Sequence, residues 1–402
     1  MKTFSNLYSI FLLLLISLVN LNILADEQQN KIHTDQAELE LIQIIDLIQA
    51  QKIDTALSKS NKSLQKYPNF KLLNAVHADL LYSQHNKLIE PFRIAKNQQN
   101  KEKLLFEASV RLDSVNASTQ LHQEHLPDLV KYIDDSTAYF FVIDFSKSRL
   151  YLFENSPDNL PILIADHYVT IGANGYKKQI KGDSKTPLGI YHVTSFLDDN
   201  QLPELYGWGA FPINYPNAWD KKNQRTGSGI WLHGVPRNTY SRPPLDSKGC
   251  LVISNDFLIN IASYLKINTP VILTQSINWI PKKHFKQKDN AYKKALNEWK
   301  NAWQSKNIKR YLGFYSKSFN NNKKNYSSWA KHKRRIFAKT KRIDIKIKQL
   351  SVFSYPGESD MLAVSFYQSY KGDRYRSGGY KQQYWKKEAD GQWRIIYEFT
   401  GG

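Results

Sequence analysis

The stretch Ile230-Trp-Leu-His-Gly-Val-Pro236, together with Ser247-Lys-Gly-Cys-Leu-Val-Ile253, decides the fold and holds the only cysteine of the 402-residue chain. Each half contains a short apolar run of strand type, which ends at His233 in the first half and follows Cys250 in the second. A thiol becomes a useful nucleophile when a base raises its thiolate fraction, and a histidine at the end of a neighbouring strand supplies such a base. The alternative is that Cys250 is a small buried hydrophobe.

The amino terminus favours a reactive role for this cysteine. An apolar run from Ile10 to Val19 precedes Ala25-Asp26, and this pattern predicts a secretory signal peptide over residues 1–25, with an uncleaved membrane anchor as the alternative. We therefore expect the protein in the periplasm or cell envelope. A single cysteine cannot form an internal disulfide there, so it indicates a reactive thiol or an intermolecular bridge.

The excess of positive charge lies entirely in the last third of the chain. Residues 281–402 contain 29 Lys and Arg against 9 Asp and Glu, which equals the net charge of +20 of the whole chain. Such a region suits an acidic partner. Because we expect the protein outside the cytoplasm, an anionic envelope polymer or glycan is favoured and nucleic acid is not expected.

Residues 26–135 are predicted to form an α-helical segment. Apolar residues recur at helical spacing from Leu39 to Ile48, and again after the break at Tyr67-Pro-Asn-Phe70. Helix, turn and helix in this order resemble tetratricopeptide-type hairpins, and a protein partner is an alternative to simple packing for this segment. A later helix is expected over about 103–121, before a linker near Pro127.

The periodicity changes at Ala138 to that of β-strands. Residues 139–145 and 150–153 predict a hairpin, and further short strands with turn signals extend to Thr274. This pattern predicts a mainly-β sandwich domain over residues 136–277. Residues 285–402 combine helices that carry Trp299, Trp303 and Trp329 with four alternating segments, which predicts an α+β domain.

Three motifs resemble the L,D-transpeptidase catalytic domain, also called the YkuD domain. They are Lys185-Thr-Pro-Leu-Gly-Ile-Tyr191, His233-Gly234 and Ser247-Lys-Gly-Cys250, in the order and spacing of that family. The last third resembles the NTF2-like domain that accompanies this catalytic domain in some envelope proteins. The resemblance therefore implies a multidomain protein with a helical segment, a YkuD-type β-sandwich and an NTF2-like domain.

The resemblance also implies site residues. Cys250 would be the nucleophile, His233 the general base, Gly234 the residue whose backbone orients the histidine, and Gly249 part of the oxyanion loop. Substrate-binding candidates are Ser247, Lys248, Arg237 and Trp231. No metal and no cofactor is implied.

The chain departs from the family at two positions. Lys248 stands where histidine is usual, and Val252 stands where arginine is common. Because that arginine helps to bind substrate, Arg237, Arg242 and Lys248 are candidates to supply the charge, and the alternative is that they are solvated loop residues.

The implied activity is that of a cysteine L,D-transpeptidase acting on peptidoglycan stem peptides. The alternatives are an L,D-carboxypeptidase, which trims tetrapeptides to tripeptides, and a catalytically silent wall-binding scaffold. The sequence does not decide between an amine and water as the acyl acceptor.

Overall fold

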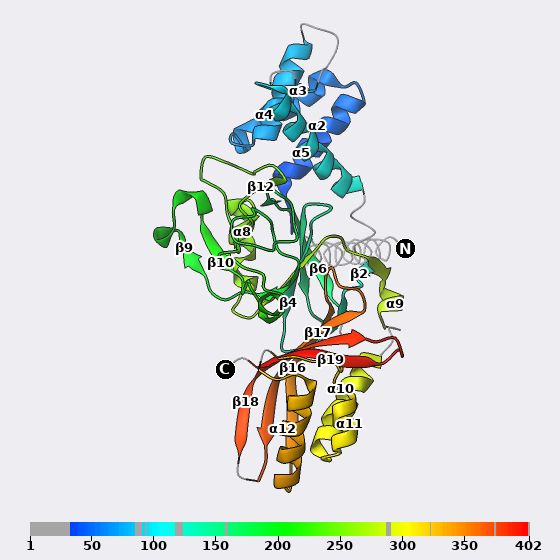
Figure 1. The fold of residues 1–402 in the computed structure, drawn as a ribbon. Helices are drawn as coiled ribbons and strands as arrows, with labels where there is room; N and C mark the ends of the chain where they lie inside the picture. The colour runs from blue at the N-terminus through cyan, green and yellow to red at the C-terminus, as the bar shows by residue number, and fades with distance from the viewer. Residues whose placement is uncertain are drawn as a thin grey trace, which may run out of the picture.

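The computed structural model describes residues 33–84, 91–92, 95–116, 124–156, 160–286, 291–321, 323–373 and 375–400. These residues form three regions, which follow one another down Figure 1 as a group of helices, a β-rich middle region, and a sheet with its own helices. The signal peptide predicted over residues 1–25 lies outside the described residues. Within the described part of the chain, no helix has the length and apolarity needed to cross a membrane.

The first region confirms the prediction of helices near the amino terminus. Its helices are α2 (Gln36–Gln49), α3 (Ile53–Lys66), α4 (Lys71–Ser83) and α5 (Gln98–Asn116). Helix α2 begins at Asp35, whose carboxylate accepts hydrogen bonds from the N–H groups of Ala37 and Glu38. The predicted break at Tyr67-Pro-Asn-Phe70 separates α3 from α4.

The middle region confirms the prediction of a two-layer β domain. A six-stranded sheet has the order β1-β6-β5-β4-β14-β8, and a four-stranded sheet has the order β13-β11-β10-β9. The strands of the first sheet are β1 (His33–Thr34), β4 (Tyr139–Asp144), β5 (Arg149–Glu154), β6 (Ile162–Tyr168), β8 (Gly189–His192) and β14 (Pro270–Thr274). Those of the second are β9 (Leu197–Asp198), β10 (Gly209–Pro212), β11 (Trp231–His233) and β13 (Leu251–Val252). A buried apolar core that includes Phe141, Leu232 and Leu251 packs between them.

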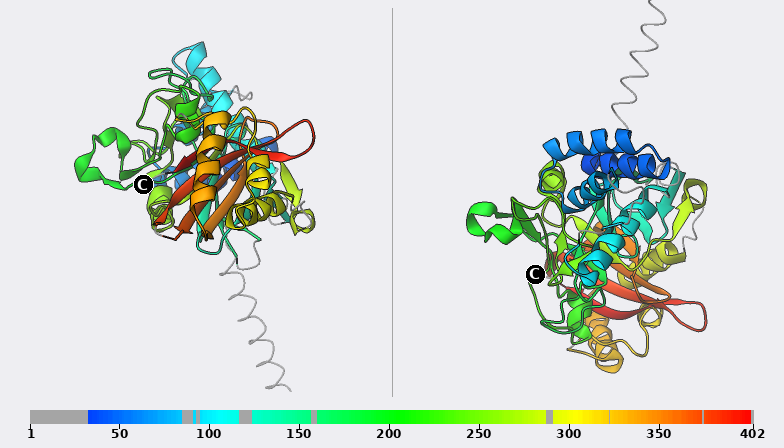
Figure 2. Two further views of the ribbon diagram at one scale, coloured as in Figure 1. Left: turned by 60° about the horizontal axis from the view of Figure 1, so that its bottom comes forward. Right: turned by 90° about the horizontal axis from the view of Figure 1, so that it is seen from above.

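The third region has the helices and the four strands that the sequence predicts. Helices α10 (Ala291–Gln304), α11 (Ile308–Gly313) and α12 (Tyr326–Lys339) cover one face of a sheet with the order β19-β18-β17-β16-β3, as the left view of Figure 2 shows. Its last four strands are β16 (Asp344–Ser354), β17 (Met361–Lys371), β18 (Arg376–Lys387) and β19 (Trp393–Thr400). The helices bury Trp299 and Trp303 against the sheet.

One prediction for the helical segment is wrong. Residues 125–133, expected in that segment and its linker, form the strands β2 (His125–Pro127) and β3 (Val130–Ile133). Strand β2 pairs with β15 (Trp279–Pro281), and β3 pairs with β16 at the edge of the third region's sheet. The pairing buries Val130 and Ile133, and no local pattern reveals such a long-range partner.

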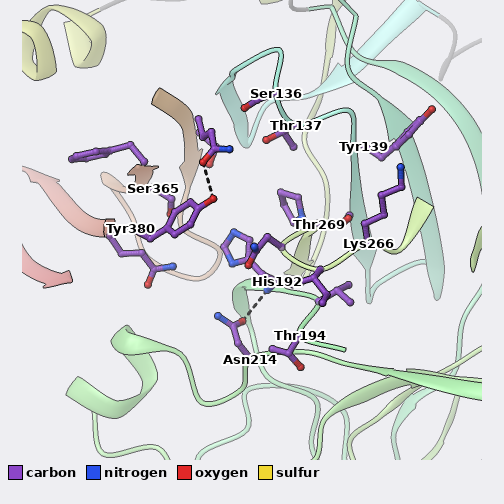
Figure 3. A pocket seen from close by; sticks show the side chains of 18 of the residues that line it. Ser136, Thr137, Tyr139, His192, Thr194, Asn214, Lys266, Thr269, Ser365 and Tyr380 are labelled. Carbon is purple, nitrogen blue, oxygen red and sulfur yellow. Dashed lines mark hydrogen bonds between the residues drawn. The ribbon is translucent and has the colours of Figure 1, made fainter. Parts of the chain in front are cut away.

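The outer face of the third region's sheet packs against the middle region. Trp219 stacks on Tyr384 with 5.0 Å between ring centroids and meets Tyr355 edge-on. Beside this contact lies a cavity of about 610 Å³ lined by both regions, including His192, Lys266 and Tyr380 (Figure 3). Neither Cys250 nor His233 lines this cavity.

Candidate functional site

Parallel pairing of β11 with β13 brings the two motif segments together. Its register places Leu232 opposite Leu251, so Cys250 precedes its strand beside Trp231. His233 lies two residues further along β11 and points to the same face as Trp231, because side chains alternate along a strand. The ring of Tyr206 packs against both side chains, with its centroid 4.9 Å from that of the His233 ring and 4.9 Å from that of the Trp231 ring.

The His233 ring is oriented by a backbone carbonyl. Its Nδ1 lies 2.6 Å from the carbonyl oxygen of Gly234, so this nitrogen carries the proton and donates it to that oxygen. The other ring nitrogen, Nε2, then has a free lone pair and can accept the proton of a thiol. His233 is 3% exposed, and burial lowers its pKa to about 4, although the Gly234 bond opposes this shift. The imidazole is therefore neutral at pH 7.

Besides accepting a hydrogen bond from His233, residue 234 has to be glycine for a steric reason. A Cβ atom at this position would collide with Oδ1 of Asn255. Oδ1 of Asn255 accepts from the N–H of Trp208 at 3.0 Å, and its Nδ2 donates to the carbonyl of Val235 at 2.8 Å. Because Asn255 follows closely after Cys250, these bonds hold the histidine segment against the cysteine segment.

The Cys250 thiol is protonated in the resting protein. Burial raises its pKa, while the backbone N–H of Trp231, which points at the sulfur, and the charges of Arg242 and Lys178 lower it. The net shift is upward, and the S–H group donates to the carbonyl of Gly229 over 3.4 Å. A neutral thiol and a neutral imidazole suit a reaction in which the base takes the thiol proton as the sulfur attacks, rather than beforehand.

This resting state predicts how the thiol reacts with iodoacetamide. Because its pKa is raised above the ordinary 9.0, the midpoint of the alkylation rate against pH should lie above pH 9.0. Stopped-time alkylation followed by intact-mass spectrometry measures this profile, and the single cysteine makes the assignment unambiguous. A midpoint near neutral pH would show instead a preformed thiolate–imidazolium pair.

The turn before Cys250 is organised by Ser247. Its hydroxyl donates to the carbonyl of Cys250 at 2.7 Å and accepts from the N–H of Gly249 at 3.0 Å. The N–H of Gly249 is therefore engaged within the turn, and the place of Gly249 in an oxyanion loop stays a prediction. The N–H of Cys250 has no acceptor among the described residues, so it is the donor available to an oxyanion.

Gly249 gives the turn before Cys250 its backbone conformation. Its φ of +119° is one that other residues rarely adopt, and a Cβ atom would lie 2.7 Å from the carbonyl oxygen of Lys185. This close approach is held by Thr186, which is fully buried. The Thr186 hydroxyl donates to the Gly249 carbonyl at 3.0 Å and accepts from the N–H of Gly172 at 2.9 Å.

Thr186→Val should lower the free energy of unfolding by about 1–3 kcal/mol, because it leaves the buried N–H of Gly172 without an acceptor. Equilibrium urea unfolding measures the change. Thr194→Val is the matched control, since the exposed Thr194 makes one hydroxyl bond, to the carbonyl of Pro212 at 3.1 Å. Equal losses in the two variants would contradict the role given to Thr186.

Among the residues that the structure describes, no contact brings two of the predicted substrate-binding residues to the thiol. The guanidinium of Arg237 is 73% exposed and pairs with Asp199 at 2.7 Å. Lys248 is exposed on the turn itself. Trp231 and Ser247 do lie next to Cys250. The backbone N–H of Trp231 points at the sulfur, and the hydroxyl of Ser247 organises the turn before Cys250.

The sequence analysis missed Lys178 and gave no definite place to Tyr206 and Arg242. Tyr206 comes from the 3-10 turn Glu204–Tyr206 and contacts His233, a position that no local pattern indicates. Arg242 lies in the loop between the motifs and pairs with Asp246 through Nε at 2.9 Å. Lys178 is buried against Asp183 at 2.6 Å. Within the described part of the chain, no cluster of three or more His, Cys, Asp or Glu could hold a metal ion.

Comparison with known proteins matches two parts of the chain to family models. The L,D-transpeptidase catalytic domain matches residues 138–273, and the Cds6 C-terminal NTF2-like domain matches residues 291–399. No curated protein matched the chain.

Two similar solved structures are matched over almost their whole length. Bd1075 from Bdellovibrio bacteriovorus is 30% identical with a TM-score of 0.60, over 69% of this chain and 98% of that one. The helical cell shape determining protein Pgp2 from Campylobacter jejuni is 23% identical with a TM-score of 0.56, over 74% of this chain and 99% of that one.

Proposed function

Since this chain belongs to the family built on the L,D-transpeptidase (YkuD) catalytic domain with a Cds6-type NTF2-like domain, we propose that it is a cysteine acyltransferase of peptidoglycan stem peptides. The observation that carries the proposal is the neutral His233, whose Nδ1 is held by the Gly234 carbonyl beside the segment of Cys250. This arrangement suits a thiol that must be deprotonated during attack.

The reaction proceeds in two steps. The sulfur of Cys250 attacks the carbonyl carbon of the L-configured centre of the third stem residue, and His233 takes the thiol proton. The N–H of Cys250 donates to the oxygen that becomes negative. The C–N bond then breaks, His233 returns the proton to the leaving amine, and D-alanine departs from a thioester.

The acceptor completes the reaction. An amine of another stem peptide forms a new amide and a crosslink, whereas water forms a carboxylate and a trimmed tripeptide. In both cases His233 removes a proton from the acceptor, and the sulfur leaves as the restored thiol.

Charge near the thiol supports recognition of an anionic substrate. Val252, at the position where the family commonly has arginine, is 2% exposed and bonds through its backbone to Thr170. We propose that Arg242 supplies the positive charge instead, because its field acts on both Cys250 and His233. The charge of Arg242 therefore replaces that of the usual arginine from a different loop.

The experiment that tests the proposal uses purified protein with tetrapeptide muropeptides and with whole sacculi. Mass spectrometry of the products distinguishes tripeptide with free D-alanine from dimers with a 3–3 crosslink. Tripeptide without dimers would identify a carboxypeptidase, and 3–3 dimers a transpeptidase. No difference from the Cys250→Ala variant on either substrate would refute the enzymatic function and favour a wall-binding scaffold.

We place this activity in the periplasm or cell envelope, where its substrate lies, and propose an anionic wall polymer as a partner of the third region. Helix α12 presents exposed Lys331, Arg334, Arg335 and Lys339. Binding to sacculi should weaken with added salt and weaken further in the Arg334→Glu/Arg335→Glu variant, as sedimentation with sacculi would measure. Binding that ignores both salt and charge reversal would contradict this partner.

A further inference from the structure

The helical region is joined to the catalytic region by a buried network of charges. Glu38, at the start of α2, is fully buried and pairs with Arg149 of β5 at 2.6 Å and with Arg111 of α5 at 2.9 Å. Arg149 also binds Asp166 of β6 at 2.6 Å. Such pairs exist only while both regions stay in contact, since opening them would leave charges unpaired in an apolar setting. The helices are therefore docked firmly.

Asp35, which lies at this interface, is linked to the chain segments before and after Cys250. The carboxylate of Asp35 accepts a hydrogen bond from the hydroxyl of Tyr240 at 2.5 Å, and Tyr240 lies in the loop before Cys250. The other oxygen of Asp35 lies 3.2 Å from Nε2 of His167. The same His167 nitrogen is 3.1 Å from the hydroxyl of Ser254, which caps the helix that follows Cys250. Asp35 is 7% exposed.

Further contacts fix the loop at Tyr240 and Ser241. The Tyr240 ring packs on Phe70, with centroids 4.8 Å apart, and its N–H donates to the carbonyl of Asn69 at 3.2 Å. The hydroxyl of Ser241 accepts from Arg111 at 3.0 Å. Two consecutive loop residues are thus held by the helices.

The next residues carry this constraint to the thiol. The carbonyl of Arg242 accepts from the hydroxyls of Tyr168 and Thr170, each at 2.9 Å, and its guanidinium binds both the side chain and the carbonyl of Asp246. Asp246 directly precedes Ser247, whose hydroxyl shapes the turn of Cys250. The path from the helices to the nucleophile therefore consists of hydrogen bonds that are linked by short stretches of backbone.

We propose that the amino-terminal helices are a structural part of the catalytic centre, in which Asp35 acts as a positioning residue for Cys250 through Tyr240 and Arg242. The inference rests on the proposed function for its activity measurement but not for its measurement of thiol reactivity. The helices fix the loop from which the Arg242 charge acts on the thiol, and they hold the cysteine segment from both ends.

The test compares Asp35→Asn, Tyr240→Phe and Arg242→Gln with a matched control. Asparagine still caps α2, and phenylalanine keeps the ring contacts of Tyr240, so both variants should fold. Glu40→Gln is the control, because Glu40 is a buried carboxylate of the same helix that binds only Ser63 and Lys66, at 2.5 Å and 2.8 Å, among the described residues. Circular dichroism and urea unfolding would establish the folded state of each variant.

Two readouts are expected to change together. The kcat for product formation from tetrapeptide muropeptides should fall about tenfold in Asp35→Asn and Tyr240→Phe, because the nucleophile is misplaced, and KM should rise because Arg242, the proposed substrate contact, is displaced with it. The midpoint of iodoacetamide alkylation should move to higher pH in these two variants and in Arg242→Gln. The charge of Arg242 lowers the pKa of the thiol, and each of these changes removes or displaces that charge. Glu40→Gln should leave both readouts unchanged.

Folded Asp35→Asn and Tyr240→Phe variants whose alkylation midpoint and kcat both match the wild type would overturn the proposal. A wild type without peptide activity would refute the proposed function, and the alkylation profiles would still decide the positioning role of Asp35. A shift of equal size in Glu40→Gln would also overturn it, because the effect would then follow from general loosening of the helices.

Discussion

Cys250→Ala should reduce tripeptide or crosslink formation by about 10⁴-fold or more, because removing a covalent nucleophile eliminates the acyl-enzyme route altogether. The loss should appear in kcat. Product formation from tetrapeptide muropeptides, measured by mass spectrometry over long incubations, gives the residual rate. Intact-protein mass should show a thioester adduct on the wild type and none on the variant.

Loss of the fold would not account for this result. Cys250 is only partly buried, and the hydrogen bond that its thiol donates to the carbonyl of Gly229 is a weak one of 3.4 Å, so its removal should change the urea midpoint little. Cys250→Ser is the second variant, since a hydroxyl has nearly the size of the thiol but ionises far less readily. Activity in either variant above a hundredth of the wild-type rate would mean that another group performs the attack.

His233→Gln should reduce kcat by about 10²- to 10⁴-fold at neutral pH, the usual contribution of a general base. The thiol pKa is raised, so the thiolate is scarce at pH 7 without a base to take the proton. The glutamine amide can still donate to the carbonyl of Gly234, as Nδ1 of the histidine does at 2.6 Å. The cost should therefore be chemical rather than structural.

The pH dependence of the His233→Gln activity distinguishes the loss of a base from the loss of a positioning contact. Above its raised pKa the thiol ionises without help, so the ratio of wild-type to variant activity should narrow as the pH rises through that pKa. His284→Gln is the control, because His284 is exposed on α9 (Lys282–Lys286) and should leave the profile unchanged. A ratio that stays constant up to high pH would show that His233 positions the thiol but does not deprotonate it.

Much of the fold could be predicted because its elements follow local patterns. The alternation of Tyr139 to Phe145 predicts β4 and its turn into β5, and the helical spacing of Leu39 to Ile48 predicts α2. The break at Tyr67-Pro-Asn-Phe70 separates two helices for reasons contained in those four residues. The strands β2 and β3 were missed because their partners, β15 and β16, lie more than 100 residues away in the chain.

The sequence by itself supplied the candidate residues for the proposed chemistry, because His233-Gly234 and Ser247-Lys-Gly-Cys250 resemble the motifs of the YkuD domain. Only the tertiary structure decided how those groups are supported. It engages the N–H of Gly249 with Ser247, seats Gly249 against Lys185, and joins Asp35 to Tyr240 across 205 residues. Local spacing sets which side chains share a strand or turn, whereas a hydrogen bond between distant segments depends on how the whole chain packs.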